Sequence, residues 1–176
     1  DIRTVIVSSD KDLMQLIGPG TSMFDPSKNI EIGRAEVIKK FGVAPEKVVD
    51  VQSLAGDSVD NVPGVPGIGV KTAAILINEY ENLDTLLERA HEIKQPKRRE
   101  SLIEHADLAR VSRELVTLDE NVPDIAALES LLGRRTDDAT LLKFLEAQEF
   151  KNVISRVRSR SGMEAVDTAD VKEADS

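Results

Sequence analysis

Two pairs of aspartates in this chain have side chains and spacings that could hold metal ions. Asp10 and Asp12 follow the apolar segment TVIVSS, and Asp57 and Asp60 lie three residues apart in GDSVDN. If the four carboxylates converge, they need cations to neutralise them, and an oxygen-rich site of this kind suits Mg²⁺ or Mn²⁺. Two such ions could bind a phosphate, activate a water and stabilise a leaving oxygen. The predicted chemistry is therefore metal-assisted phosphodiester hydrolysis.

Each aspartate pair also has a simpler interpretation. Asp10 can cap the helix that follows it, and Asp12 can place a favourable negative charge in the first turn of that helix. Asp57 and Asp60 can be ordinary turn residues. The two interpretations differ in whether the four carboxylates lie together in the fold.

A glycine-rich turn follows the second aspartate pair. The stretch VPGVPGIGVKTAAILI has the form of a helix-hairpin-helix, with Gly67 and Gly69 at the turn and Lys71 just after it. Glycines let a backbone approach a phosphate closely, and the free N–H groups at a helix start attract it. Such a contact grips one strand of a duplex without reading its bases. The alternative is a plain tight turn between two packed helices.

The composition limits the classes of function. The 176 residues include no cysteine and two histidines, which excludes disulfides and thiolate metal sites and disfavours a histidine-rich site. No apolar run reaches membrane-spanning length and no signal peptide is visible, so we expect a cytoplasmic protein without a membrane partner. The net charge of −9 argues mildly against nucleic-acid binding, but five of the acids lie within residues 161–176.

The first 42 residues alternate between strand and helix patterns. A β-branched run at residues 2–8 predicts a strand covered on both faces, hence a parallel sheet, and DKDLMQLI predicts a helix after it. Residues 18–33 predict a β-hairpin at a sheet edge. Residues 34–41 predict a short helix closed by Gly42.

From Pro45 onward the pattern is helical. Residues after Arg160 are small, polar and acidic, which predicts a disordered tail. Between these points we expect a basic link at residues 94–99, a loop at 117–124, and helices at 48–54, 69–80, 83–90, 99–116 and 138–148.

Two stretches in combination resemble a known family. VIVSSDKDLMQLI, followed by VVDVQSLAGDSVDNVPGVPGIGVKTAAILINEYENLDTLL, closely resembles the C-terminal part of the 5′-3′ exonuclease domain of bacterial DNA polymerase I, which belongs to the flap endonuclease family. The resemblance implies an α/β, mostly helical fold. Its parts are a partial PIN-like parallel-sheet nuclease core (1–45), a helix-three-turn-helix (helix-hairpin-helix) subdomain with C-terminal helices (46–160), and an acidic linker (161–176).

The resemblance also implies an activity and a set of site residues. The activity is Mg²⁺- or Mn²⁺-dependent cleavage of DNA at 5′ ends and 5′ flaps during replication and repair. A K⁺ ion held by backbone carbonyls near residues 56–69 is implied as well. The residues that match the family motifs are Asp10, Asp12, Asp57 and Asp60 as metal ligands, and Gly67, Ile68, Gly69, Lys71 and Thr72 as DNA contacts.

Other parts of the family pattern are missing from this sequence. The family has an N-terminal half with further aspartates, an acidic cluster and a helical arch that threads the 5′ end. We therefore expect a fragment of a bacterial, nucleoid-associated protein, inefficient at cleavage alone, with an open edge at its first strand. Its expected partners are duplex DNA with a 5′ end or flap and the rest of the polymerase chain. The alternatives are a non-catalytic helix-hairpin-helix DNA-binding module and a helical protein–protein interaction domain.

Overall fold

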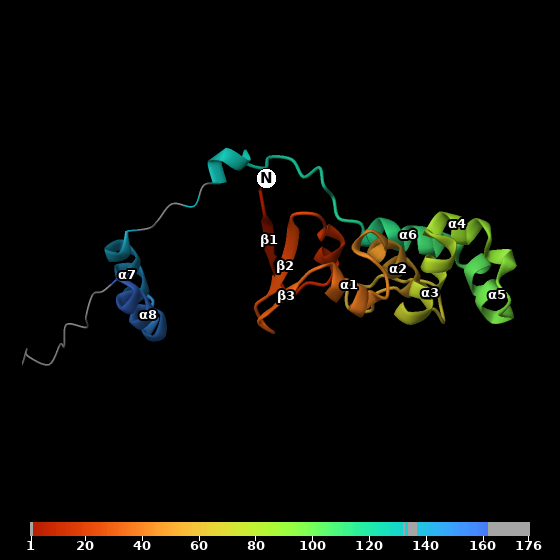
Figure 1. Ribbon diagram of the computed structural model, residues 1–176, viewed down its shortest axis with the longest axis horizontal. Coiled ribbons are helices and arrows are strands. Elements are labelled where there is room, and N and C mark those ends of the chain that lie inside the picture. The colour runs from red at the N-terminus through yellow and green to blue at the C-terminus, as the bar shows by residue number, and fades with distance from the viewer. Residues whose placement is uncertain (1, 132, 134–136, 162–176) are drawn as a thin grey trace, which may run out of the picture. The chain divides into compact units, whose positions relative to one another are not determined.

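The computed structural model describes residues 2–131, 133 and 137–161 (Figure 1). The chain divides into two compact units, residues 1–121 and 122–176, and each is described by itself. The acidic tail predicted for residues 161–176 lies almost entirely outside the described residues.

Unit 1 begins with a three-stranded sheet. β1 (Thr4–Val7) pairs in parallel with β2 (Thr21–Asp25), and β2 pairs antiparallel with β3 (Ile30–Ile32). A 3₁₀ helix, η1 (Asp12–Leu16), leads from β1 toward β2 at the place where DKDLMQLI predicts a helix. The hairpin predicted at residues 18–33 is confirmed.

β1 is an edge strand with exposed apolar side chains. Val5 and Val7 are 47% and 67% exposed. The prediction of a strand covered on both faces is wrong for the chain as described, because Val5 and Val7 expose one face of β1. The parallel pairing that the same pattern predicted is confirmed, and β1 has one neighbour in the sheet. The open edge expected for this strand is confirmed.

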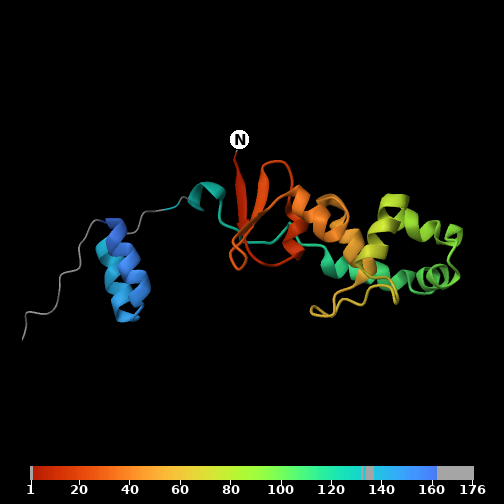
Figure 2. The ribbon, with the colours of Figure 1, turned by 60° about the horizontal axis from the view of Figure 1, so that its bottom comes forward.

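The remainder of unit 1 is helical, and Figures 1 and 2 place its sheet at one end and α4 and α5 at the other. α2 packs against both α3 and α6. The helices are α1 (Arg34–Phe41), η2 (Pro45–Lys47), α2 (Val48–Ala55), α3 (Val70–Tyr80), α4 (Leu83–Glu88), η3 (Ala90–Glu92), α5 (Pro96–Glu104) and α6 (Ala106–Val116).

The single helix predicted at residues 99–116 is wrong. The structure has two helices there, α5 and α6, because the backbone of His105 leaves the helical conformation (φ −110°, ψ 24°). α5 also begins inside the predicted basic link, where Pro96 occupies a first-turn position that suits proline.

One hydrophobic core runs through unit 1. It joins Met23 and Ile32 of the sheet to Leu54, Ile77 and Leu102 of the helices. The sheet and the helices that follow residue 45 therefore share buried apolar surface.

Unit 2 contains the 3₁₀ helix η4 (Leu128–Leu131) and the helices α7 (Asp138–Ala147) and α8 (Lys151–Ser161). α7 matches the helix predicted at residues 138–148, whereas α8 is a helix that the sequence patterns did not indicate. The two helices pack through Leu142, Leu145 and Val157. Among the described helices of either unit, none has the length and apolarity needed to cross a membrane.

Candidate nucleic-acid interface and carboxylate cluster

The loop between α2 and α3 carries the second aspartate pair and the glycine turn. The loop comes back on itself so that Gly56 and Gly64, which have positive φ values of 68° and 62°, lie against each other. A Cβ atom on Gly64 would lie 2.4 Å from the backbone nitrogen of Gly56, so only glycine allows this approach. The N–H of Val65 donates to the carbonyl of Leu54 at 2.8 Å, which closes the loop on the end of α2.

Two serines of the following helices attach this loop to the rest of unit 1. The buried Ser112 hydroxyl of α6 accepts a hydrogen bond from the N–H of Gly64 at 2.9 Å. The Ser101 hydroxyl of α5 donates to the carbonyl of Pro66 at 2.7 Å. Because the loop is held at both points, it presents its motifs from a fixed backbone.

The glycine turn leads directly into α3 and leaves open space around it. Gly67 has a φ of +80°, and a Cβ atom on Gly67 or Gly69 would meet no atom within 4 Å. Gly69 is the N-cap of α3, and no side chain caps the helix there. The first turn of α3 exposes Lys71 and partly exposes Thr72. This is the geometry that the phosphate-binding interpretation needs.

Ile68 faces the other way. Its side chain is 4% exposed and belongs to the core of unit 1. Of the predicted DNA contacts, Ile68 can therefore contribute only through its backbone.

The carboxylates of Asp57 and Asp60 face the ammonium group of Lys11. Asp57 forms an ion pair with Lys11 Nζ, and Asp60 Oδ2 lies 3.8 Å from the same nitrogen. The hydrogen bond from Lys11 lowers the pKa of Asp57 below its ordinary value, and the same bond raises the pKa of Lys11. Sequence reasoning missed Lys11 as a site residue, although its position between two aspartates was an available signal.

Asp10 and Asp12 make local contacts at the start of η1. Asp10 Oδ1 accepts a hydrogen bond from the N–H of Asp12 at 3.0 Å, which is a local turn contact. The N-cap position of η1 is Lys11 and not Asp10. Asp12 Oδ1 accepts a hydrogen bond from Gln52 Nε2 of α2 at 2.5 Å. The charge of Asp12 also helps to raise the pKa of Lys11.

These residues fit part of a metal site. Asp57 and Asp60 offer oxygen ligands of the kind that a hard divalent cation prefers, and the Lys11 ammonium occupies the cationic position between them. In residues 2–131, 133 and 137–161, no three acidic or histidine side chains are grouped so that they could hold one ion. The convergence of all four predicted ligands therefore stays a prediction.

Comparison with known proteins identifies the family. A family described as "5′-3′ exonuclease, C-terminal SAM fold" matches residues 43–139, more than half of the chain. DNA polymerase I of Rhizobium leguminosarum is 54% identical over 152 residues, which are 86% of this chain and 15% of that protein. The 5′-3′ exonuclease of Aquifex aeolicus is 32% identical over 157 residues, 88% of this chain and 52% of that one. The chain thus spans between about a seventh and about half of the length of these curated relatives.

Solved structures agree on the fold. A 5′-exonuclease of bacteriophage T5 superposes with a TM-score of 0.61 at 23% identity, covering 65% of this chain and 47% of that one. The catalytic core of Rad2, solved with a DNA substrate, has a TM-score of 0.51 at 15% identity, covering 81% of this chain and 51% of that one. The predicted α/β, mostly helical fold is confirmed. The chain belongs to the 5′-3′ exonuclease family, in the part that carries its C-terminal SAM fold.

Proposed function

We propose that this chain is the duplex-gripping part of a metal-dependent 5′ nuclease that acts at 5′ ends and 5′ flaps of DNA during replication and repair. One observation carries the proposal. A single braced loop, residues 56–69, holds Asp57 and Asp60 at one end and the open Gly67–Gly69 turn at the other. This arrangement sets a fixed spacing between a cation site and a phosphate contact on the same duplex. Such a protein works on the bacterial nucleoid, in the cytoplasm.

DNA binding is proposed to begin at α3. The free N–H groups after Gly69 point at a strand phosphate, Lys71 adds charge, and Thr72 lies in the same turn. The open space at Gly67 and Gly69 lets the phosphate approach the backbone. The catalytic core of Rad2, which has a similar fold, was solved with a DNA substrate, and this supports DNA as the ligand. A K⁺ ion would have to be held by carbonyls of residues 56–69, of which Pro66 already accepts a hydrogen bond from Ser101.

The carboxylates are proposed to hold a divalent cation, Mg²⁺ or Mn²⁺. Asp57 and Asp60 would be direct ligands after displacement of Lys11, with Asp10 and Asp12 approaching from the end of β1. A cation there supplies a Lewis acid that neutralises charge on the cut phosphate. The T5 5′-exonuclease has been solved with divalent metal ions, which supports a metal requirement in the family. We propose that the rest of a longer polymerase-type polypeptide completes the ligand set, and that this chain alone cleaves poorly.

One observation favours a second function. The Lys11 ammonium already satisfies Asp57 and Asp60 in the described structure. A helix-hairpin-helix module that binds duplex DNA without catalysis would need no other cation.

The DNA contact is tested by fluorescence anisotropy of a labelled 5′-flap duplex titrated with the 176-residue chain. We expect saturable binding that weakens with salt, and a loss of about tenfold or more in the double variant Gly69→Val with Lys71→Ala. A side chain at Gly69 meets open space, so this variant should fold normally by circular dichroism. Gly18→Val with Lys94→Ala is the matched control, since a Cβ at Gly18 is also free of contacts. Binding unaltered by the hairpin variant would refute the phosphate contact.

The metal assignment is tested by calorimetric titration with Mn²⁺. Asp57→Asn with Asp60→Asn should abolish divalent binding, whereas Asp107→Asn with Asp119→Asn, on exposed surface, should not. If the chain binds Mn²⁺ equally well without Asp57 and Asp60, the nuclease-ligand role fails and the DNA-binding module becomes the better description.

A further inference from the structure

A groove lies beside the glycine turn, between the C-terminal end of α1 and the first part of α3. It has a volume of about 290 Å³, and three lysines line it, Lys39 and Lys40 of α1 and Lys71 of α3. The rest of its lining is one polar side chain, Asn78, and small or apolar residues of both helices and the end of α1: Phe41, Gly42, Val70, Ala74 and Ile75. No acidic residue is among those that line it.

The walls of this groove are held in place by a close approach of two backbones. Gly42 ends α1 with a φ of 76°, and a Cβ atom there would lie 2.8 Å from the Cβ of Ala74 in α3. The Asn78 amide donates to the carbonyl of Gly42 at 3.0 Å. The lysines of α1 and α3 are therefore brought together by packing rather than by chance contacts of long side chains.

In the part of the chain that the structure describes, the lysines of the groove form no ion pairs with carboxylates. Within the described residues, neither Lys39, Lys40 nor Lys71 takes part in an ion pair.

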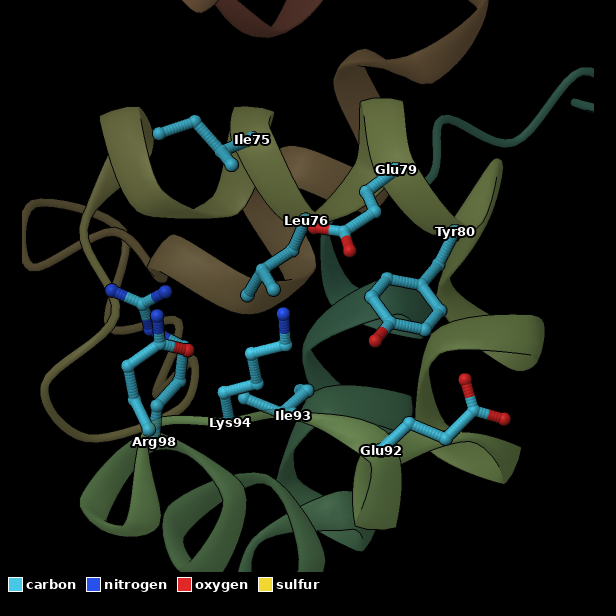
Figure 3. Close-up of a pocket in the computed structure, with 9 residues that line it drawn as sticks. Ile75, Leu76, Glu79, Tyr80, Glu92, Ile93, Lys94 and Arg98 are labelled. Atoms are coloured by element: carbon cyan, nitrogen blue, oxygen red, sulfur yellow. The ribbon is translucent and has the colours of Figure 1, made fainter.

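Another pocket of the same unit shows the contrast. The pocket of Figure 3 has a volume of about 280 Å³, and its lining includes Glu79 and Glu92 as well as Lys94 and Arg98. Glu92 also pairs with Arg89 at 2.6 Å. Charges in that pocket are matched, so it has no excess attraction for an anion.

Helix stability does not explain the lysine cluster. Lys39 and Lys40 lie in the last turn of α1, where the helix dipole favours cations, but Lys71 lies in the first turn of α3, where the dipole disfavours them. Burial lowers the pKa of Lys40, and the charges of Lys28 and Lys11 lower it further, against smaller opposing effects of Asp12 and Asp25. The charged residues that line the groove are all cations, so an anion in the groove would be attracted by all three lysines.

We propose that this groove holds a backbone phosphate of the DNA strand, adjacent to the phosphate at the glycine turn, with Lys39 and Lys40 as its cationic contacts. The inference rests on the proposed function and adds a path for the strand, from the start of α3 across the end of α1. The contact is independent of base sequence, because only the strand's phosphates meet the lysines.

The test compares two double variants of the full chain in the same anisotropy assay over a series of salt concentrations. Lys39→Ala with Lys40→Ala should weaken binding of the 5′-flap duplex by roughly tenfold and reduce the slope of log affinity against log salt by about 2. Lys94→Ala with Lys143→Ala removes the same charge from exposed positions elsewhere and should leave both quantities close to those of the unaltered chain.

Three results would overturn the proposal. Equal weakening in both double variants would mean that only total charge matters. If the Lys39 and Lys40 variant binds as tightly as the unaltered chain and the Gly69 and Lys71 variant binds more weakly, the groove does not hold a phosphate. The phosphate contact at the glycine turn would then still stand. Absence of duplex binding by the unaltered chain at low salt would count against both.

Discussion

Glycines with the same backbone conformation have different roles in the loop between α2 and α3. Gly56, Gly64 and Gly67 all have positive φ. The first two lie against each other's backbone, whereas Gly67 has open space where a side chain would begin. The first pair is therefore required by the fold, and Gly67 is available for a ligand.

This difference predicts unequal effects of alanine. Gly64→Ala should lower the free energy of unfolding by about 3 kcal/mol or more, because the new Cβ would lie 2.4 Å from the nitrogen of Gly56 in addition to the backbone strain. Gly67→Ala carries the strain alone and should lower it by about 1 kcal/mol. Urea denaturation monitored by circular dichroism measures both values. Equal losses in the two variants would contradict the crossing of the two backbones.

At the residue scale, the candidate site was predictable in part. The type and spacing of the aspartates and glycines pointed to Asp57, Asp60 and the turn. Lys11 was harder to predict. Its position between two aspartates was the one signal, but a lysine in a polar stretch is ordinarily solvated and its partners lie more than forty residues away. The burial of the Ile68 side chain was not predicted either, because it depends on how the loop packs against the rest of unit 1.

Elements with local start and stop signals were predictable. Gly42 closes α1 in the left-handed conformation, and the Asn82 side chain caps α4 by accepting from the N–H of Thr85. α8 has no Ser, Thr, Asp or Asn directly before its first residue, and its apolar positions (Val153, Ile154 and Val157) gain their burial by packing on α7. A helix that is stabilised mainly by packing on another helix, as α8 is by α7, was not predictable from the local sequence pattern.

The turn of the β2–β3 hairpin predicts a dependence of stability on pH. The Ser27 hydroxyl donates to the buried Asp25 carboxylate at 2.6 Å, and Lys28 also donates to it, so its pKa falls to about 2 from 3.8. Because the folded pKa is the lower one, Asp25 stabilises the fold fully above about pH 4, and this contribution is lost as pH falls toward 2.

Calorimetry of Asp25→Asn tests this expectation. The variant should have a lower Tm at pH 7 and a smaller decrease in Tm between pH 4 and pH 2 than the unaltered chain. Glu120→Gln, in the exposed loop after α6, serves as the control. A decrease in Tm of the same size in both variants over that pH range would show that Asp25 is not the group responsible.

For unit 1 as a whole, the shared core makes the sheet and helices one cooperative body. Met23 of β2 and Leu102 of α5 come from opposite ends of the sequence of this unit, and both are fully buried in the same cluster. The resemblance divides the chain at residue 45 into a nuclease core and a helical subdomain. Continuous apolar packing joins the residues on the two sides of that boundary.

Truncation of either side chain should destabilise the whole of unit 1. Met23→Ala and Leu102→Ala should each lower the free energy of unfolding by about 2–5 kcal/mol. Hydrogen exchange should show reduced protection in both the sheet and the helices for each variant. Leu131→Ala, at an exposed position, should change stability by less than about 0.5 kcal/mol. If protection fell only in the half that carries the substitution, the two parts would be separate folding units.

The ion pair of Lys11 has a consequence for how this protein is handled. The cation in front of Asp57 and Asp60 is covalently attached to the chain, so neither dialysis nor a chelator such as EDTA can remove it. The loop should keep its shape in buffers stripped of divalent ions. A divalent ion that binds there, as proposed, would have to displace the Lys11 ammonium. Its occupancy would then depend on how much more strongly the two carboxylates bind the divalent ion than they bind the ammonium. The proposed divalent ion should therefore bind more weakly than at a pair of carboxylates with no competing ammonium group.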